Sequence, residues 1–120
     1  RRWPKRDPNK HYYLVPNEVF NLGLTSHEIA VYNYLLRCED RRTYQCHPSY
    51  RTISDVVHLT VSTVMKHITK LADRQFITVE STSYIDKRGM KWNGNNLYTI
   101  LPIQMAMDYC YQQQLLRLEA

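Results

Sequence analysis

Hydrophobic side chains recur every three or four positions after residue 25, which predicts an amphipathic helix. Thr25 and Glu28 have the spacing of a capping box, in which each side chain accepts a hydrogen bond from a free backbone N–H of the first turn. The charged segment 38–42 is expected to end this helix. Its apolar face carries Ile29, Tyr32, Leu35 and Leu36.

A second, shorter helix is predicted after a β-prone segment at 43–46. Ser49 is its expected N-cap, since a serine hydroxyl accepts a hydrogen bond from the first turn. The dipeptide His58-Leu59 then makes a turn. Glycine is common at the first turn position, so His58 indicates some strain or a relaxed turn. The residues expected to face the core are Ile53, Val56 and Val57.

Thr60 is the expected cap of a third helix, whose two sides differ in chemistry. Val64, Ile68 and Leu71 fall at i, i+4 and i+7 and therefore form a buried stripe. The helix is expected to end near Arg74. The residues facing away from the core are short, polar or cationic, with two apolar neighbours: Ser62, Lys66, Thr69 and Lys70 beside Val61 and Met65.

A β-hairpin follows this helix. Alternating apolar and polar residues at 76–85 predict one strand, and a return strand comes after it. Its tip could lie at 86–89 or at Asn93-Gly94, but the second choice leaves the start of the first strand without a partner. We assign the tip to 86–89 and interpret Asn93-Gly94 as a bulge or bend. The expected partner of Ile77 is then Tyr98 or its neighbour.

A helix, a turn, a second helix and a basic hairpin are typical of a winged helix-turn-helix. We predict an α+β domain over residues 12–101 with a three-helix core, a β-hairpin wing and an added C-terminal helix. The polar side of the third helix would read a DNA major groove, because short residues allow close approach and Lys bonds guanine or phosphate. The expected phosphate contacts are Lys70 on this helix and Lys87, Arg88 and Lys91 on the wing. The alternative is that these basic residues are present only to keep the protein soluble.

The two ends of the chain leave alternatives open. Residues 1–11 hold five basic residues against one Asp and form an N-terminal arm, either a solvated tail or a DNA-contacting extension. Residues 102–120 are expected to form the last helix, and its stripe either completes the core or packs on a second subunit. We favour a homodimer through residues 103–118. The stripe consists of Ile103, Met107, Tyr111, Leu115 and Leu118.

Composition narrows the function classes. The 120 residues suffice for one core, and a net charge of +5 favours a polyanionic partner. Cys38, Cys46 and Cys110 include no close pair, and no membrane span or signal peptide is visible, so we expect a cytoplasmic protein without disulfides. His47 and His58 do not complete a zinc pattern, and no catalytic constellation is recognisable. We therefore expect no enzyme activity, no metal and no cofactor.

Three sequence runs carry a family resemblance. The run LTVSTVMKHITKLADRQFI resembles the recognition helix and strand of bacterial winged helix-turn-helix proteins. With LTSHEIAVYNYLL and CHPSYRTIS, it is similar to DNA-binding domains of Gram-positive plasmid, phage and conjugative-element proteins, including replication initiators. Val61 stands where such helices often carry Arg, which leaves contact with a thymine methyl. The resemblance implies DNA contacts from Ser49, Tyr50, Arg51, Thr60, Val61, Ser62, Met65 and Lys66.

Together these features predict sequence-specific binding of double-stranded DNA by a transcriptional regulator or accessory factor of a mobile element. One alternative is replication initiation or origin binding, in which the same domain would load partners. Another is a winged helix that binds proteins and no DNA.

Overall fold

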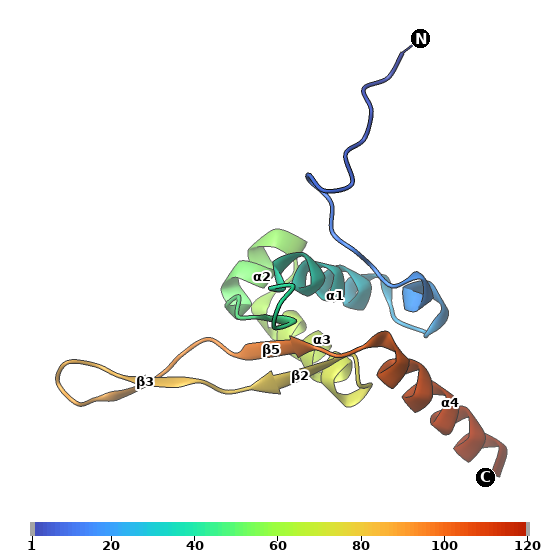
Figure 1. The fold of residues 1–120 in the computed structure, drawn as a ribbon. Helices are drawn as coiled ribbons and strands as arrows, with labels where there is room; N and C mark the ends of the chain where they lie inside the picture. The colour runs from blue at the N-terminus through green and yellow to red at the C-terminus, as the bar shows by residue number, and fades with distance from the viewer. Residues whose placement is uncertain (1, 120) are drawn as a thin grey trace.

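The computed structural model describes residues 2–119; Arg1 of the predicted arm and Ala120 of the predicted last helix lie outside it. The predicted α+β winged helix-turn-helix with a C-terminal helix is confirmed (Figure 1). The elements in chain order are η1 (Asn17–Asn21), α1 (Ser26–Cys38), β1 (Gln45–Cys46), α2 (Tyr50–Val57), α3 (Val61–Asp73), β2 (Ile77–Glu80), β3 (Ser83–Ile85), β4 (Lys91–Asn93), β5 (Leu97–Ile100) and α4 (Ile103–Glu119).

The three helices of the core begin at the predicted caps. The Thr25 hydroxyl accepts from the Glu28 backbone N–H at 3.2 Å, and the Glu28 carboxylate accepts from the Thr25 N–H at 3.0 Å. Ser49 and Thr60 each accept from the backbone N–H three residues later. Each cap satisfies a donor that the first turn of a helix leaves free, so local sequence alone sets where these helices start.

The buried stripe of α3 lies at the centre of the core. Val64, Ile68 and Leu71 are all buried, as predicted, and α3 packs against α1, α2 and β2. Val31 and Phe76, which were not among the predicted core residues, are also fully buried. Tyr32, Leu35 and Leu36 of α1 are buried as expected, whereas Ile29 is only partly buried. The ring of Phe76 meets Tyr32 edge to face with centroids 5.2 Å apart, which closes the core under β2.

Val56 does not face the core, contrary to prediction. It is 44% exposed, whereas Ile53 is buried and Val57 packs against the core from the next turn. Helix α2 has eight residues and contacts α1 and α3 with the face that carries Ile53 and Val57. Val56 lies to the side of that face, because neighbouring residues on a helix are turned by about 100°.

The sheet has three antiparallel strands in the order β1-β5-β2, and β3 and β4 continue the hairpin as a separate ribbon. The tip lies at 86–89 as predicted, but the expected pairing of Ile77 with Tyr98 or its neighbour is wrong. Ile77 pairs with Ile100, and Val79 pairs with Tyr98. The pairing register is shifted because the hairpin closes between Asp86 and Met90, and because the returning strand carries one extra residue between β4 and β5.

That extra residue forms the predicted bulge at Gly94. Between the pairs Glu80–Leu97 and Ser83–Asn93, two residues of the first strand face three of the second. The Gly94 N–H donates to the Thr82 carbonyl at 2.9 Å. A Cβ at Gly94 would lie 2.5 Å from the Thr82 hydroxyl oxygen, so any other residue there would require the Thr82 side chain to shift.

Helix α4 contacts the core only with its first half. Ala106 is buried, and Ile103, Met107 and Cys110 pack beside it. The later residues of the predicted stripe do not pack on the core, since Tyr111, Leu115 and Leu118 are exposed. A strict four-residue repeat turns by about 40° around a helix at each step, so its later members rotate away from the first ones.

The segment before η1 runs away from the body as an extended chain with a turn at residues 7–10 (Figure 1). None of the helices between residues 2 and 119 is long and apolar enough to cross a membrane.

We predict that Ile68→Ala lowers the free energy of unfolding by about 2–5 kcal/mol, because it removes buried methyl groups and leaves a cavity. Ile68 is 2% exposed, whereas Ile85 on the wing is 72% exposed. Ile85→Ala is the matched control and should change stability by less than about 0.5 kcal/mol. Urea unfolding followed by circular dichroism measures both, and equal losses would contradict the assigned core.

Candidate nucleic-acid interface

The outward side of α3 is a continuous exposed surface. Every residue predicted to face away from the core does so: Val61, Ser62, Met65, Lys66, Thr69 and Lys70. All but Val61 also line one shallow hollow together with His67. The side chains here are short near the helix start and cationic farther along. The surface therefore allows close approach of a partner at its first turn and supplies charge beside it.

Thr60 lies next to this surface but is already engaged in capping. Its hydroxyl donates to the Thr63 hydroxyl at 2.8 Å and accepts from the Thr63 backbone N–H at 3.3 Å. Thr60 therefore serves first to start α3, and its contact with DNA stays a prediction.

The turn between α2 and α3 is fixed by local hydrogen bonds. His58 adopts the left-handed conformation, with φ +59° and ψ +42°, as the C-cap of α2. The Leu59 N–H donates to the Ser54 carbonyl at 3.3 Å, and the Ser54 hydroxyl donates to the Leu59 carbonyl. A non-glycine residue in this conformation costs roughly 1–2 kcal/mol. The expected strain at His58 is therefore present, and the hydrogen bonds offset it and hold the angle between the helices.

The start of α2 is tied to the base of the wing. The Asn96 side-chain amide donates to the Tyr50 hydroxyl at 2.8 Å, and Asn95 donates to the His47 carbonyl at 3.2 Å. Sequence analysis predicted Tyr50 as a DNA contact and did not detect this bond, because nothing in the spacing links residues 46 positions apart. Ser49 is half-buried and caps α2, which leaves Arg51 as the exposed residue of the three predicted there.

The wing tip is organised by Asp86. Its carboxylate accepts from the Arg88 N–H at 2.8 Å, the Met90 N–H at 3.0 Å and the Trp92 indole N–H at 2.9 Å. Gly89 completes the turn with φ +80°. The sequence signal for this role was an Asp at the start of a turn, which commonly bonds the backbone two residues on.

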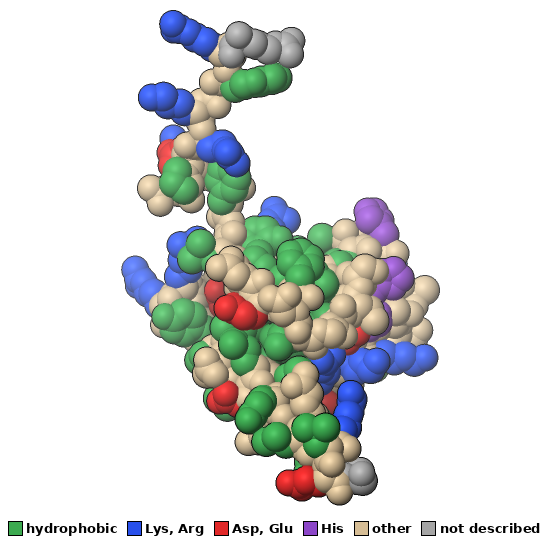
Figure 2. All heavy atoms as spheres, turned by 90° about the vertical axis from the view of Figure 1, so that its right-hand side faces the viewer, with side chains coloured by type: hydrophobic (Ala, Val, Ile, Leu, Met, Phe, Trp, Pro, Cys, Tyr) green, Lys and Arg blue, Asp and Glu red, His purple; other side chains and the backbone are tan. Residues whose placement is uncertain are grey.

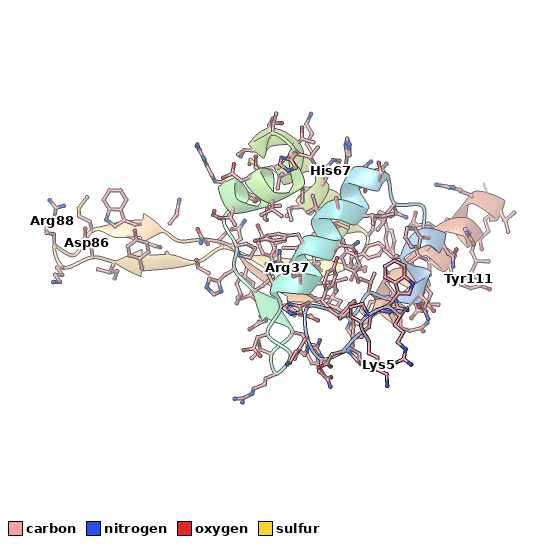
Figure 3. All side chains as sticks on the ribbon, turned by 90° about the horizontal axis from the view of Figure 1, so that it is seen from above. Lys5, Arg37, His67, Asp86, Arg88 and Tyr111 are labelled. Atoms are coloured by element: carbon pink, nitrogen blue, oxygen red, sulfur yellow. The ribbon has the colours of Figure 1, made fainter. Side chains whose placement is uncertain are left out.

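The predicted wing cations lie around this turn with their side chains exposed. Lys87, Arg88 and Lys91 are exposed, and Figure 3 shows Asp86 and Arg88 at the far end of the ribbon, away from His67 on α3. The wing and the outward side of α3 are thus two separate surfaces, with the base of the wing and the start of α2 between them.

Glu28 is a buried carboxylate between α1 and α3 that the sequence analysis recognised only as a cap. Burial raises its pKa, but the Thr25 hydrogen bonds and the positive charges of Lys70 and Arg74 outweigh burial, so the pKa lies below its ordinary value. Glu28 therefore stays charged near neutral pH and places a negative charge beneath the lysine end of α3.

Within residues 2–119, no group of three or more His, Cys, Asp or Glu side chains is placed to hold a metal ion. The three cysteines are free, and burial raises the pKa of the Cys46 thiol to about 12, which keeps it protonated.

Comparison with known proteins gives a family match and a fold likeness. Residues 22–77 match a protein family described as "Helix-turn-helix domain", a span from the end of η1 into β2 that includes α2 and α3. Among similar solved structures is "Possible transcriptional regulator from Methanosarcina mazei Go1", with a TM-score of 0.52 and 22% sequence identity, covering 82% of this chain and 76% of that one. Curated protein sequences gave no significant match. The structural likeness supports the fold.

We predict that the Trp92–Asp86 bond survives mild acid. The Trp92, Met90 and Arg88 donors together hold the pKa of Asp86 below its ordinary value against a small desolvation effect. The bond should thus be fully present above about pH 3.9 and be lost only as the pH falls through the lowered pKa.

The indole N–H signal of Trp92 in proton NMR measures this. The Asp86→Asn variant is the matched control, because an amide oxygen still accepts a hydrogen bond but does not titrate. A Trp92 signal that shifts with a midpoint above about pH 4 in the native protein would contradict the geometry of the tip.

Proposed function

We propose that this protein binds double-stranded DNA sequence-specifically, with α3 in the major groove and the wing against the phosphate backbone. The observation that carries the proposal is the outward side of α3, which is exposed and contains no acidic residue between Val61 and Ala72. A helix that enters a groove needs this combination, because a carboxylate there would be repelled by phosphate.

Direct readout would come from the first two turns of α3. Ser62 and Lys66 offer hydrogen bonds to base edges, and Val61 and Met65 offer apolar contact with thymine methyl groups. Thr69 and Lys70 lie farther along the same side of α3, where we expect contact with the phosphate backbone of the DNA. The caps and the fixed turn hold these side chains in one arrangement, which favours specificity.

Further phosphate contacts, in addition to that of Lys70 on α3, would come from three separate regions. The wing supplies Lys87, Arg88 and Lys91, the start of α2 supplies Arg51, and the extended arm carries further cations at residues 2–10. Each cation that neutralises a phosphate releases condensed counterions, so this part of the affinity depends on salt and not on sequence.

The biological role we propose is that of a transcriptional regulator or accessory factor of a mobile element in the cytoplasm. The Methanosarcina mazei protein of similar fold is named as a possible transcriptional regulator, which supports the regulator role. The sequence runs that resemble plasmid, phage and conjugative-element proteins support the mobile-element setting. Replication initiation is the alternative that uses the same DNA surface.

We also propose a homodimer through α4. Tyr111, Leu115 and Leu118 form an exposed apolar stripe on the part of α4 beyond the core, and Leu118 is 81% exposed. Figure 2 shows hydrophobic side chains gathered across the end of the molecule formed by η1 and α4, where Phe20 is 79% exposed. Burying this exposed apolar surface against the same surface of a second copy would stabilise a dimer. A two-fold dimer would also present two recognition helices to the DNA.

We predict that Lys66→Ala weakens binding to the preferred duplex by about 1–3 kcal/mol and relaxes the choice of base at one position. Fluorescence anisotropy with duplexes that vary at each position measures both effects. Arg37→Ala removes an equal charge from the exposed end of α1 and is the control. Equal weakening by both variants would assign the effect of Lys66 to general charge.

We predict that Lys87→Ala combined with Arg88→Ala weakens binding to all duplexes alike. The slope of log affinity against log salt should become shallower by about 2, because two phosphate contacts are lost at about 0.9 each. Anisotropy at several salt concentrations gives the slope. An unchanged slope would remove the wing from the interface.

We predict that Leu115→Glu combined with Leu118→Glu converts a dimer into a monomer, because it places four charges in the paired stripes. Leu116→Glu is the matched control, since Leu116 is exposed on a different side of α4. Sedimentation velocity measures the mass. A native protein that stays monomeric at high concentration would exclude the dimer.

A further inference from the structure

A hollow of about 560 Å³ lies where the middle and end of α4 pass the turn before α1 and the end of α3. Its volume falls within the range of about 300–1,000 Å³ that is usual for small-molecule sites. It lies on the side of α4 that faces the body, beyond the point where apolar contacts with the core end. The hollow is therefore enclosed by three separate segments of the chain.

The residues around the hollow are donors without a carboxylate among them. Its lining includes two arginines, Arg74 and Arg117, and three residues with side-chain amides, Asn21, Gln113 and Gln114. Tyr109 adds a hydroxyl and an aromatic ring. Two guanidinium groups repel a cation, whereas an oxyanion can accept charge-assisted hydrogen bonds from both.

Arg74 is held in place before any ligand arrives. Its guanidinium donates to the Leu22 carbonyl and, at 3.4 Å, to the Gly23 carbonyl, and it lies 6.0 Å from the centre of the Phe76 ring. A guanidinium group has five N–H donors, so donors remain after these two bonds. Arg74 also stabilises the charge of Glu28, which does not line the hollow.

Arg117 of α4 provides the second charge. It lies in the last turn of α4 and has no hydrogen-bond or ion-pair partner among residues 2–119. Arg74 is thus already ordered, so of the two arginines only Arg117 would lose side-chain freedom when an anion binds.

We propose that this hollow binds a small oxyanion, a phosphate or carboxylate compound, held by Arg74 and Arg117 and oriented by the amides of α4. The site is remote from the wing, and it does not depend on whether the protein binds DNA. It touches the end of α3, so an anion bound there would contact the helix whose other end carries the exposed polar surface.

The full chain is titrated with pyrophosphate and, separately, with citrate, by calorimetry and by mapping backbone amide shifts in NMR. We expect saturable binding of at least one probe, with shifts at Gly23, Arg74 and residues 109–117. Pyrophosphate alone would identify a phosphate ligand, and citrate alone a carboxylate ligand. No saturable binding of either probe, or shifts confined to other surfaces, would overturn the proposal.

Arg117→Gln tests the site without touching the core, because Arg117 is exposed. We expect it to weaken binding at least tenfold. Arg37→Gln removes the same charge at the opposite end of α1 from Gly23 and should leave binding within twofold. Arg74→Lys keeps the charge but loses the planar fork, and should also weaken binding. Equal effects of Arg117→Gln and Arg37→Gln would reduce the binding to general charge and contradict the site.

Discussion

The burial of Val64, Ile68 and Leu71 is the constraint on which the rest of the structure depends. These side chains fix the rotation of α3 against α1, α2 and the first strand of the hairpin. Once that side of the helix is turned inward, the opposite side has to face water, because the two lie across a single helix. The exposed polar surface of α3 is thus a consequence of packing, and any loss of the stripe would change which residues a partner meets.

Polar interactions then fix what packing leaves free. The cap at Thr60 and the bonds between Ser54 and Leu59 hold the turn, the two asparagines tie the wing base to α2, and Asp86 orders the tip. Each is local or near the surface and contributes little to stability by itself. Their shared effect is to hold two separate surfaces, α3 and the wing, at a set distance, which a partner spanning both requires.

Most of the fold could be predicted from the sequence, because the caps and the spacing of apolar residues are local signals. The failures arose where position depends on distant parts of the chain. Val56 is exposed, contrary to prediction, because α2 contacts its neighbours with one face only. Ile77 pairs with Ile100 instead of Tyr98 or its neighbour, because the tip and the bulge each shift the register. The bond between Tyr50 and Asn96 and the burial of Glu28 leave no trace in the spacing. Which exposed residues form the candidate DNA surface could be predicted, since exposure follows from the stripe.

The most direct test of the account is to map backbone amide shifts by NMR when the protein binds a duplex selected from a random pool. The account predicts that the shifts concentrate in residues 61–70 of α3 and 86–91 of the wing. The duplexes selected from the pool should also share a common sequence. Shifts confined to α4 or the arm, or the absence of binding at low salt, would contradict the proposed role of the helix-turn-helix surface.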